Sequence, residues 1–133
     1  MTSISQIDHI AIACTSIEQV RSFYEKALGF RIDHIEEMPK RGIRVAFIKV
    51  GEVSIELIEP LREDSEVSAF LQKRGPGLHH IAFKSSDIKT SEHNIKDHKA
   101  RLLYEESRPG AHNTLVNFIH PSSTGGVLME IVE

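Results

Sequence analysis

Branched apolar residues, Ile7, Ile10 and Ile12, are mixed with alanine near the start of the chain, and this pattern predicts a β-strand over residues 7–13. Side chains two residues apart share one face of a strand, so we expect His9 on the same face as Ala11 and Ala13. Because alanine is small, this face leaves room around the imidazole.

After the first strand, apolar residues recur every three or four positions, and this spacing predicts a helix over residues 17–28. Ser16 is a favourable N-cap, and Gly29 is a favourable residue to end the helix. We interpret this helix as one that packs on the core. Its apolar stripe consists of Ile17, Val20, Tyr24 and Leu28.

Three further strands are predicted before Pro60, over residues 30–36, 43–50 and 53–59. A polar loop with proline and glycine, residues 36–42, follows the first of these strands, and Gly51-Glu52 joins the other two as a hairpin. Glu56 lies in the middle of the last strand, where a carboxylate either faces solvent or is held by a positive partner.

The second half of the chain predicts the same order of elements after a joining segment with a short helix over residues 65–73. The predicted elements are a strand over 78–83, a helix over 88–99 capped by Ser86 or Asp87, a strand over 101–106, a turn at 108–110, a strand over 114–119, a turn over 120–126 and a strand over 126–132.

Two pairs of segments repeat each other. Residues 77–83 resemble residues 7–13 and align His80 with His9, and residues 127–133 resemble residues 53–59 and align Glu130 with Glu56. The repeat therefore supplies residues in the order His, Glu, His, Glu, which indicates two copies of one structural unit.

Each copy has the order strand, helix, strand, strand, strand. One such unit has too small an apolar face to be stable alone, so we expect two tandem βαβββ modules to pack together. The predicted fold is α+β, a curved mixed eight-stranded sheet around a metal cleft. The whole chain, 1–133, forms one domain, with module 1 over about 5–60, a linker over 61–76 and module 2 over 77–133.

The repeated residues predict a metal site. Equivalent positions of two modules face each other across such a cleft, so His9, Glu56, His80 and Glu130 are expected to converge. Two neutral imidazoles and two carboxylates suit a divalent first-row metal such as Zn, Co, Ni, Mn or Fe, and leave positions open for water or substrate. His79 has Asp8 as its counterpart and is expected to point to the opposite face.

Composition narrows the class of protein. Apolar residues make up 40% of the 133 residues, charged residues make up 26%, and the net charge is −3. Lysine and arginine are scattered, which disfavours nucleic-acid partners and a polybasic membrane anchor. The first residues have no pattern of a leader and no apolar run reaches the ~18 residues of a membrane span, so we expect a cytoplasmic protein. The one cysteine, Cys14, is interpreted as a small buried residue and not as a catalytic thiol.

At the repeated residues the chain resembles the vicinal-oxygen-chelate superfamily, which includes glyoxalase I, extradiol dioxygenases and antibiotic-resistance proteins. The similarity runs over nearly the whole length and is greatest to methylmalonyl-CoA epimerases, at residues 7–11, 55–61, 77–82, 117–121 and 126–130. The resemblance implies a metal bound by His9, Glu56, His80 and Glu130, a small-molecule acyl-CoA substrate and a homodimer.

An epimerase of this family inverts the α-carbon of methylmalonyl-CoA, or of a similar acyl-CoA, by proton abstraction through a metal-stabilised enolate. By resemblance Glu130 is the catalytic base on one face, as a ligand glutamate in glyoxalase I is thought to be. Some epimerases carry a second, non-ligand glutamate at the position that corresponds to Val45. The remaining candidates for that second role are Glu36 and Glu37 in the predicted loop, or His112.

Two alternatives stay open. A glyoxalase I-type lyase acting on a glutathione hemithioacetal uses a nearly identical ligand set, and a non-catalytic small-molecule-binding resistance protein has the same fold. A dioxygenase needs only two histidines and one carboxylate, so the fourth ligand counts against it.

Overall fold

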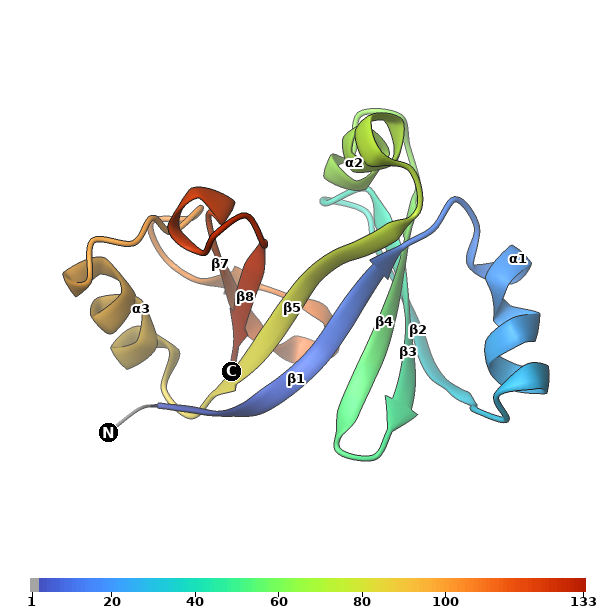
Figure 1. Ribbon diagram of the computed structural model, residues 1–133, viewed down its shortest axis with the longest axis horizontal. Coiled ribbons are helices and arrows are strands. Elements are labelled where there is room, and N and C mark those ends of the chain that lie inside the picture. The colour runs from blue at the N-terminus through green and yellow to red at the C-terminus, as the bar shows by residue number, and fades with distance from the viewer. Residues whose placement is uncertain (1–2) are drawn as a thin grey trace. The chain divides into compact units, whose positions relative to one another are not determined.

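The computed structural model describes residues 3–133 (Figure 1). Met1 and Thr2, the first of the residues predicted to have no leader pattern, lie outside the described residues. Within residues 3–133, no helix is both long enough and apolar enough to cross a membrane.

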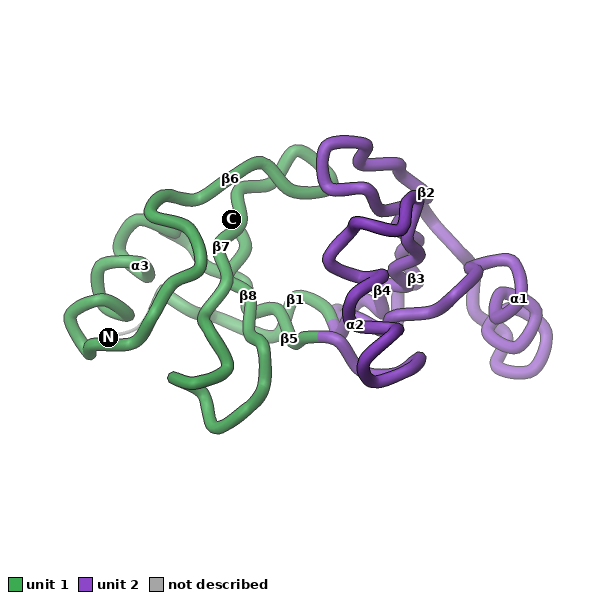
Figure 2. Tube along the Cα trace, turned by 90° about the horizontal axis from the view of Figure 1, so that it is seen from above, with its two compact units in different colours: residues 1–9, 80–133 green, residues 10–79 purple. Residues whose placement is uncertain are grey.

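The chain forms two compact units (Figure 2). Unit 1 contains the residues up to His9 together with His80–Glu133, and unit 2 contains Ile10–His79. The chain passes from one unit to the other inside two strands, β1 (Ile4–Ala13) and β5 (Gly77–Ser85). The predicted single domain of two consecutive modules stays a prediction.

Unit 2 holds the elements expected for the first module and the segment that follows it. The β3–β4 hairpin forms as predicted, with Gly51 in the positive-φ conformation that its tight turn requires. The elements are α1 (Ile17–Ser22), a π-helical turn η1 (Phe23–Ala27), β2 (Ile32–Met38), β3 (Ile43–Val50), β4 (Val53–Pro60) and α2 (Glu66–Arg74).

One face of the unit 2 strands packs on α1. Ala46, Ile48 and Leu57 are fully buried there and contact Cys14 and Ile17. Because residues alternate along each strand, their neighbours in sequence, which include Val45 and Glu56, point to the other face.

Unit 1 holds the elements of the second module. Ala82, Val116, Phe118 and Val132 form its buried apolar cluster on one face of the strands. The elements are α3 (Ile88–Asp97), β6 (Arg108–Pro109), a 3₁₀ turn η2 (Ala111–Asn113), β7 (Leu115–Ile119), a second 3₁₀ turn η3 (Pro121–Ser123) and β8 (Met129–Val132).

The strands are hydrogen-bonded in the order β2-β3-β4-β1-β5-β8-β7-β6. β5 and β8 are parallel, whereas the β2–β3, β3–β4, β7–β8 and β6–β7 pairs are antiparallel. The sheet is therefore mixed and eight-stranded, which confirms the predicted α+β class.

The predicted helix over 17–28 is wrong in its second half. The amide of Leu28 donates to the carbonyl of Phe23, five residues back, so the last turn is a π-turn. A wider turn rotates the following residue away from the α-helical face, and Leu28 is exposed. Ser16 is at the N-cap but makes no side-chain cap; the Glu59 carboxylate accepts from the amide of Ile17 at 2.9 Å instead.

Three other predictions are corrected. The second strand extends to Met38, so Glu36 and Glu37 lie in β2 and not in a loop. Residues 101–106 are not a strand: they make one isolated bridge, Leu102 with Ile119, and the buried Asn117 side chain accepts from the amide of Tyr104. Beyond this bridge, a side chain thus supplies a hydrogen bond to the backbone of the segment. The expected turn at 108–110 instead contains the two-residue strand β6.

Candidate metal centre

The two repeated histidines belong to neighbouring strands. His9 lies in β1 and His80 in β5, and both are buried. Ala82, two residues after His80 on the same face, has no exposed surface, and the ring of Phe118 packs edge-on against the imidazole of His80 at 5.3 Å between centroids. Small and aromatic neighbours thus shield the His80 imidazole from solvent.

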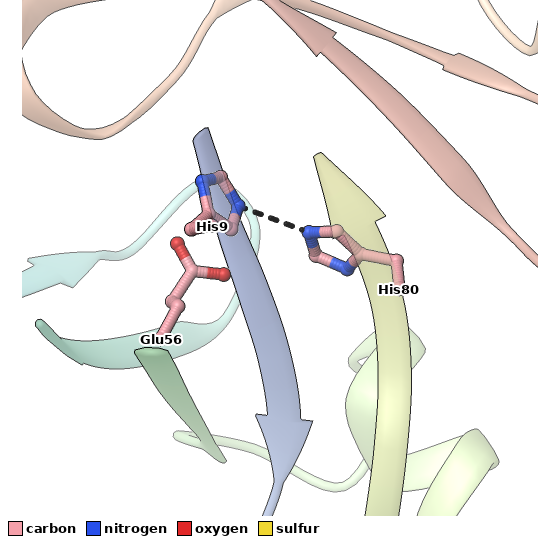
Figure 3. Close-up of side chains that lie close together, drawn as sticks. All are labelled: His9, Glu56 and His80. Carbon is pink, nitrogen blue, oxygen red and sulfur yellow. Dashed lines mark hydrogen bonds between the residues drawn. The ribbon is translucent and has the colours of Figure 1, made fainter. Parts of the chain in front are cut away.

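Unit 1 brings three of the four predicted ligands together. The two Nε2 atoms of His9 and His80 are 3.3 Å apart, as the dashed line in Figure 3 marks. A carboxylate oxygen of Glu130, from β8, lies 3.0 Å from Nε2 of His80, and its other oxygen lies 3.8 Å from Nε2 of His9. The parallel β5–β8 register, in which Ala82 is paired with Glu130, produces this convergence.

Glu56, the fourth predicted ligand, belongs to unit 2. It comes from β4 (Figure 3) and its side chain is buried, with 7% of the residue exposed. In the middle of that strand it is paired with Phe47 of β3. A buried carboxylate is costly unless a positive charge lies beside it, and a bound metal cation supplies such a charge.

Asp8 fixes the orientation of His9. Its carboxylate accepts from Nδ1 of His9 at 2.7 Å, so the imidazole presents Nε2 to His80 and Glu130. A carboxylate behind a histidine is the usual outer partner of a metal-bound imidazole, because it sets the tautomer and raises the basicity of the ligand nitrogen.

The electrostatics around Asp8 agree with this role. The hydrogen bond from His9 is the main cause that lowers the pKa of the Asp8 carboxyl, and it outweighs desolvation by burial, which raises that pKa. The positive charges of Lys84 and His112 lower it further. Asp8 is therefore ionised at neutral pH. The sequence pattern assigned Asp8 no role, although a carboxylate next to a predicted ligand histidine was the available signal.

The donor set fits a divalent metal. Unit 1 alone offers two imidazole nitrogens and a carboxylate, all buried, with the ring of His9 held by a second carboxylate. Borderline nitrogen and hard oxygen donors of this kind suit zinc and the neighbouring first-row ions. The role of His9, Glu56, His80 and Glu130 as ligands stays a prediction.

The other candidates lie elsewhere. Cys14 is buried, and desolvation is the main cause that raises the pKa of its thiol to about 11, so it is not a reactive thiolate. His79 points away from the centre and packs on the ring of Phe70, at 4.8 Å between centroids. His112 is in the positive-φ region of η2, near enough to Asp8 to affect its pKa.

Comparison with known proteins identifies the family. The family model of the glyoxalase/bleomycin resistance protein/dioxygenase superfamily matches residues 8–118. The chain belongs to this superfamily. The match includes three of the four predicted ligands and ends before Glu130.

Individual superfamily members match nearly the whole chain. The uncharacterized protein YqjC of Bacillus subtilis is 42% identical over 98% of this chain and 93% of its own length. The ethylmalonyl-CoA/methylmalonyl-CoA epimerase of Cereibacter sphaeroides is 35% identical over 96% of this chain and 97% of its own length. These similarities confirm the predicted family resemblance.

A solved structure gives the same result. A point variant of the Streptomyces coelicolor methylmalonyl-CoA epimerase, in complex with 2-nitronate-propionyl-CoA, is 39% identical, with a TM-score of 0.94, over 98% of this chain and 97% of that one. The epimerases among these relatives support the predicted enzyme class, a racemase or epimerase.

Proposed function

We propose that this protein is a metal-dependent epimerase that inverts the α-carbon of methylmalonyl-CoA or a similar acyl-CoA. The observation that carries the proposal is the convergence of His9, His80 and Glu130 on one buried point, with Asp8 behind His9. Epimerases that match nearly the full length, one of them in complex with an acyl-CoA analogue, support the substrate class.

The proposed ligands are His9, Glu56, His80 and Glu130, holding Zn, Co, Ni, Mn or Fe. When bound, such a cation supplies Lewis-acid chemistry, which stabilises negative charge that develops on a substrate oxygen. Asp8 keeps the ring of His9 in the tautomer that presents Nε2. The buried apolar surroundings of His80 exclude water, which strengthens electrostatic interactions at the centre.

Glu130 is proposed as a proton-transfer group on one face of the α-carbon. One oxygen of its carboxylate lies near His80 and the other lies near His9. One oxygen can therefore accept a proton while the other stays at the proposed metal centre. A homodimer belongs to the same proposal by family resemblance, and the cytoplasmic location stays a prediction.

The test combines elemental analysis with isotope exchange. We expect about one metal ion per chain and wash-in of solvent deuterium at the α-carbon of methylmalonyl-CoA. His80→Ala should remove the metal and the exchange and keep the fold. His79→Ala is the matched control, because that side chain packs on Phe70 and not at the centre.

The alternatives predict different results. Loss of hemithioacetal absorbance without α-carbon exchange points to a glyoxalase-type lyase. A metal-free protein that binds small molecules without turnover points to a resistance protein. Full exchange by a metal-free His80→Ala protein contradicts the proposed function.

A further inference from the structure

The β2–β3 register brings an unexpected carboxylate beside Val45. Glu36 of β2 is paired directly with Val45 of β3 in the antiparallel ladder. Directly paired residues point to the same face, with Cβ atoms about 4.5–5.5 Å apart. A side chain as long as glutamate therefore reaches the space next to Val45, where some epimerases of the family have a glutamate.

This is the face of unit 2 that carries Glu56. The β3–β4 register pairs Phe47 with Glu56 and Val45 with Ile58. Since residues two apart on a strand share a face, Glu36, Val45 and Glu56 all lie on the same face of the three strands. Val45 is only 1% exposed, so the residue paired with Glu36 is a buried apolar one.

A histidine holds Glu36 in place. Nε2 of His34 lies 2.9 Å from Oε1 of Glu36, and the two residues share a face because they are two apart on β2. The Glu36 side chain is 31% exposed, which leaves its carboxylate accessible to a small molecule. Its rotamer is thus restrained and its oxygens remain reachable.

The neighbouring glutamate, Glu37, differs from Glu36 in its face of the strand and in its exposure. Glu37 points to the opposite face, its side chain is 53% exposed, and its carboxylate accepts from the guanidinium of Arg44 at 2.9 Å. Of the two carboxylates considered from the sequence, the geometry thus favours Glu36.

We propose that Glu36 is the second acid/base residue of the reaction, replacing the glutamate that some related epimerases carry at the position of Val45, with His34 as its positioning residue. This inference rests on the proposed function, in which Glu56 on the same face is a metal ligand. It deepens that function by naming the group that handles the proton on the face opposite Glu130.

The proposed step is balanced. The Glu36 carboxylate takes the α-proton, and the electron pair of the broken C–H bond becomes the C=C bond of the enolate. Protonation of the same carbon from the opposite face, by Glu130, gives the other epimer. The reverse direction exchanges the two roles, and no oxidant or reductant is consumed.

The test uses Glu36→Gln, with Glu37→Gln as the matched control on the same strand. We expect epimerisation by Glu36→Gln to fall roughly 10²-fold or more, as for other general bases, with metal content and KM near those of the wild type. Glu37→Gln should stay within about twofold of the wild type, because Glu37 is on the other face.

Two further measurements separate catalysis from structure. Starting from each pure epimer, Glu36→Gln should exchange the α-proton with solvent from one epimer only, since Glu130 still serves the other face. Adding Val45→Glu to Glu36→Gln should restore at least ~10-fold of the lost rate, because it returns a carboxylate to the adjacent strand. His34→Gln should lower kcat and shift its pH profile, with a smaller loss than Glu36→Gln.

The outcomes are distinguishable. A wild-type protein that exchanges no α-proton overturns the proposed function and this assignment with it. A wild-type protein that exchanges, together with a folded Glu36→Gln variant that exchanges equally well from both epimers, overturns the assignment of Glu36 alone.

Discussion

From the hydrogen bond between Asp8 and His9 we predict how much metal affinity the protein loses when Asp8 is replaced. Asp8→Asn keeps a side-chain oxygen that can accept from Nδ1 of His9 but loses the negative charge, whereas Asp8→Ala loses both. The atoms are 2.7 Å apart, which is the length of a charge-assisted hydrogen bond. The two variants therefore separate the effect of charge from the effect of orientation.

Loss of such an outer partner typically weakens metal binding 10- to 100-fold, or about 1.4–2.7 kcal/mol. The Asp8 side chain is 34% exposed, so solvent screens part of its charge and we expect the lower part of that range. The expected losses are roughly 5- to 10-fold for Asp8→Asn and roughly 10- to 30-fold for Asp8→Ala.

The assay is competition between the metal-depleted protein and a chromogenic chelator, titrated with zinc or cobalt at neutral pH. Asp97→Asn, an exposed aspartate at the end of α3, is the control and should bind the metal as the wild type does. If Asp8→Ala binds the metal with wild-type affinity while His80→Ala does not bind it, the orienting role assigned to Asp8 is refuted.

Two more predictions concern stability and reactivity. The carboxylates of Glu59 and Glu133 each accept from the first amide of a helix, at 2.9 Å from Ile17 and at 2.8 Å from Ile88. Glu59→Ala and Glu133→Ala should therefore each lower the free energy of unfolding, measured in urea, by about 1–2 kcal/mol. The exposed control Glu63→Ala should change it little. Burial raises the pKa of Cys14 from 9.0 to about 11, so iodoacetamide at pH 8 should alkylate the native thiol about 100-fold more slowly than the urea-unfolded one. Because the Cys14 thiol has the higher pKa in the folded protein, its contribution to the free energy of unfolding is fully present below pH 9.0 and is lost as the pH rises towards about 11. A Cys14→Ala variant that loses the same stability over this pH range would contradict this cause.

The two caps also bear on the internal repeat. Glu133 follows Glu59 by the same number of residues as Glu130 follows Glu56, and Ile88 follows Ile17 as His80 follows His9. In each unit the glutamate three residues after the predicted ligand caps the helix that follows the first strand of the module. The repeat therefore extends from side-chain chemistry to the way each module joins its last strand to its helix.

The sequence alone determined the architecture and the candidate ligands. The runs of branched and apolar residues in β1, β3, β4 and β5 are local, bounded by turn residues, and they predicted these strands to within three residues. The recurrence of histidine and glutamate at equivalent positions is also readable without coordinates, since a duplicated module keeps its residues in register.

The tertiary structure decided what depends on neighbours across strands. The polar residues around Glu36 and Glu37 indicate a loop by composition, and only the ladder with β3 shows that they lie in a strand, on opposite faces. In the irregular segment 101–106, the buried side chain of Asn117, which is distant in the sequence, likewise bonds to the backbone of Tyr104. Interactions between residues distant in the chain leave no local period in the sequence, so only the folded register assigns them.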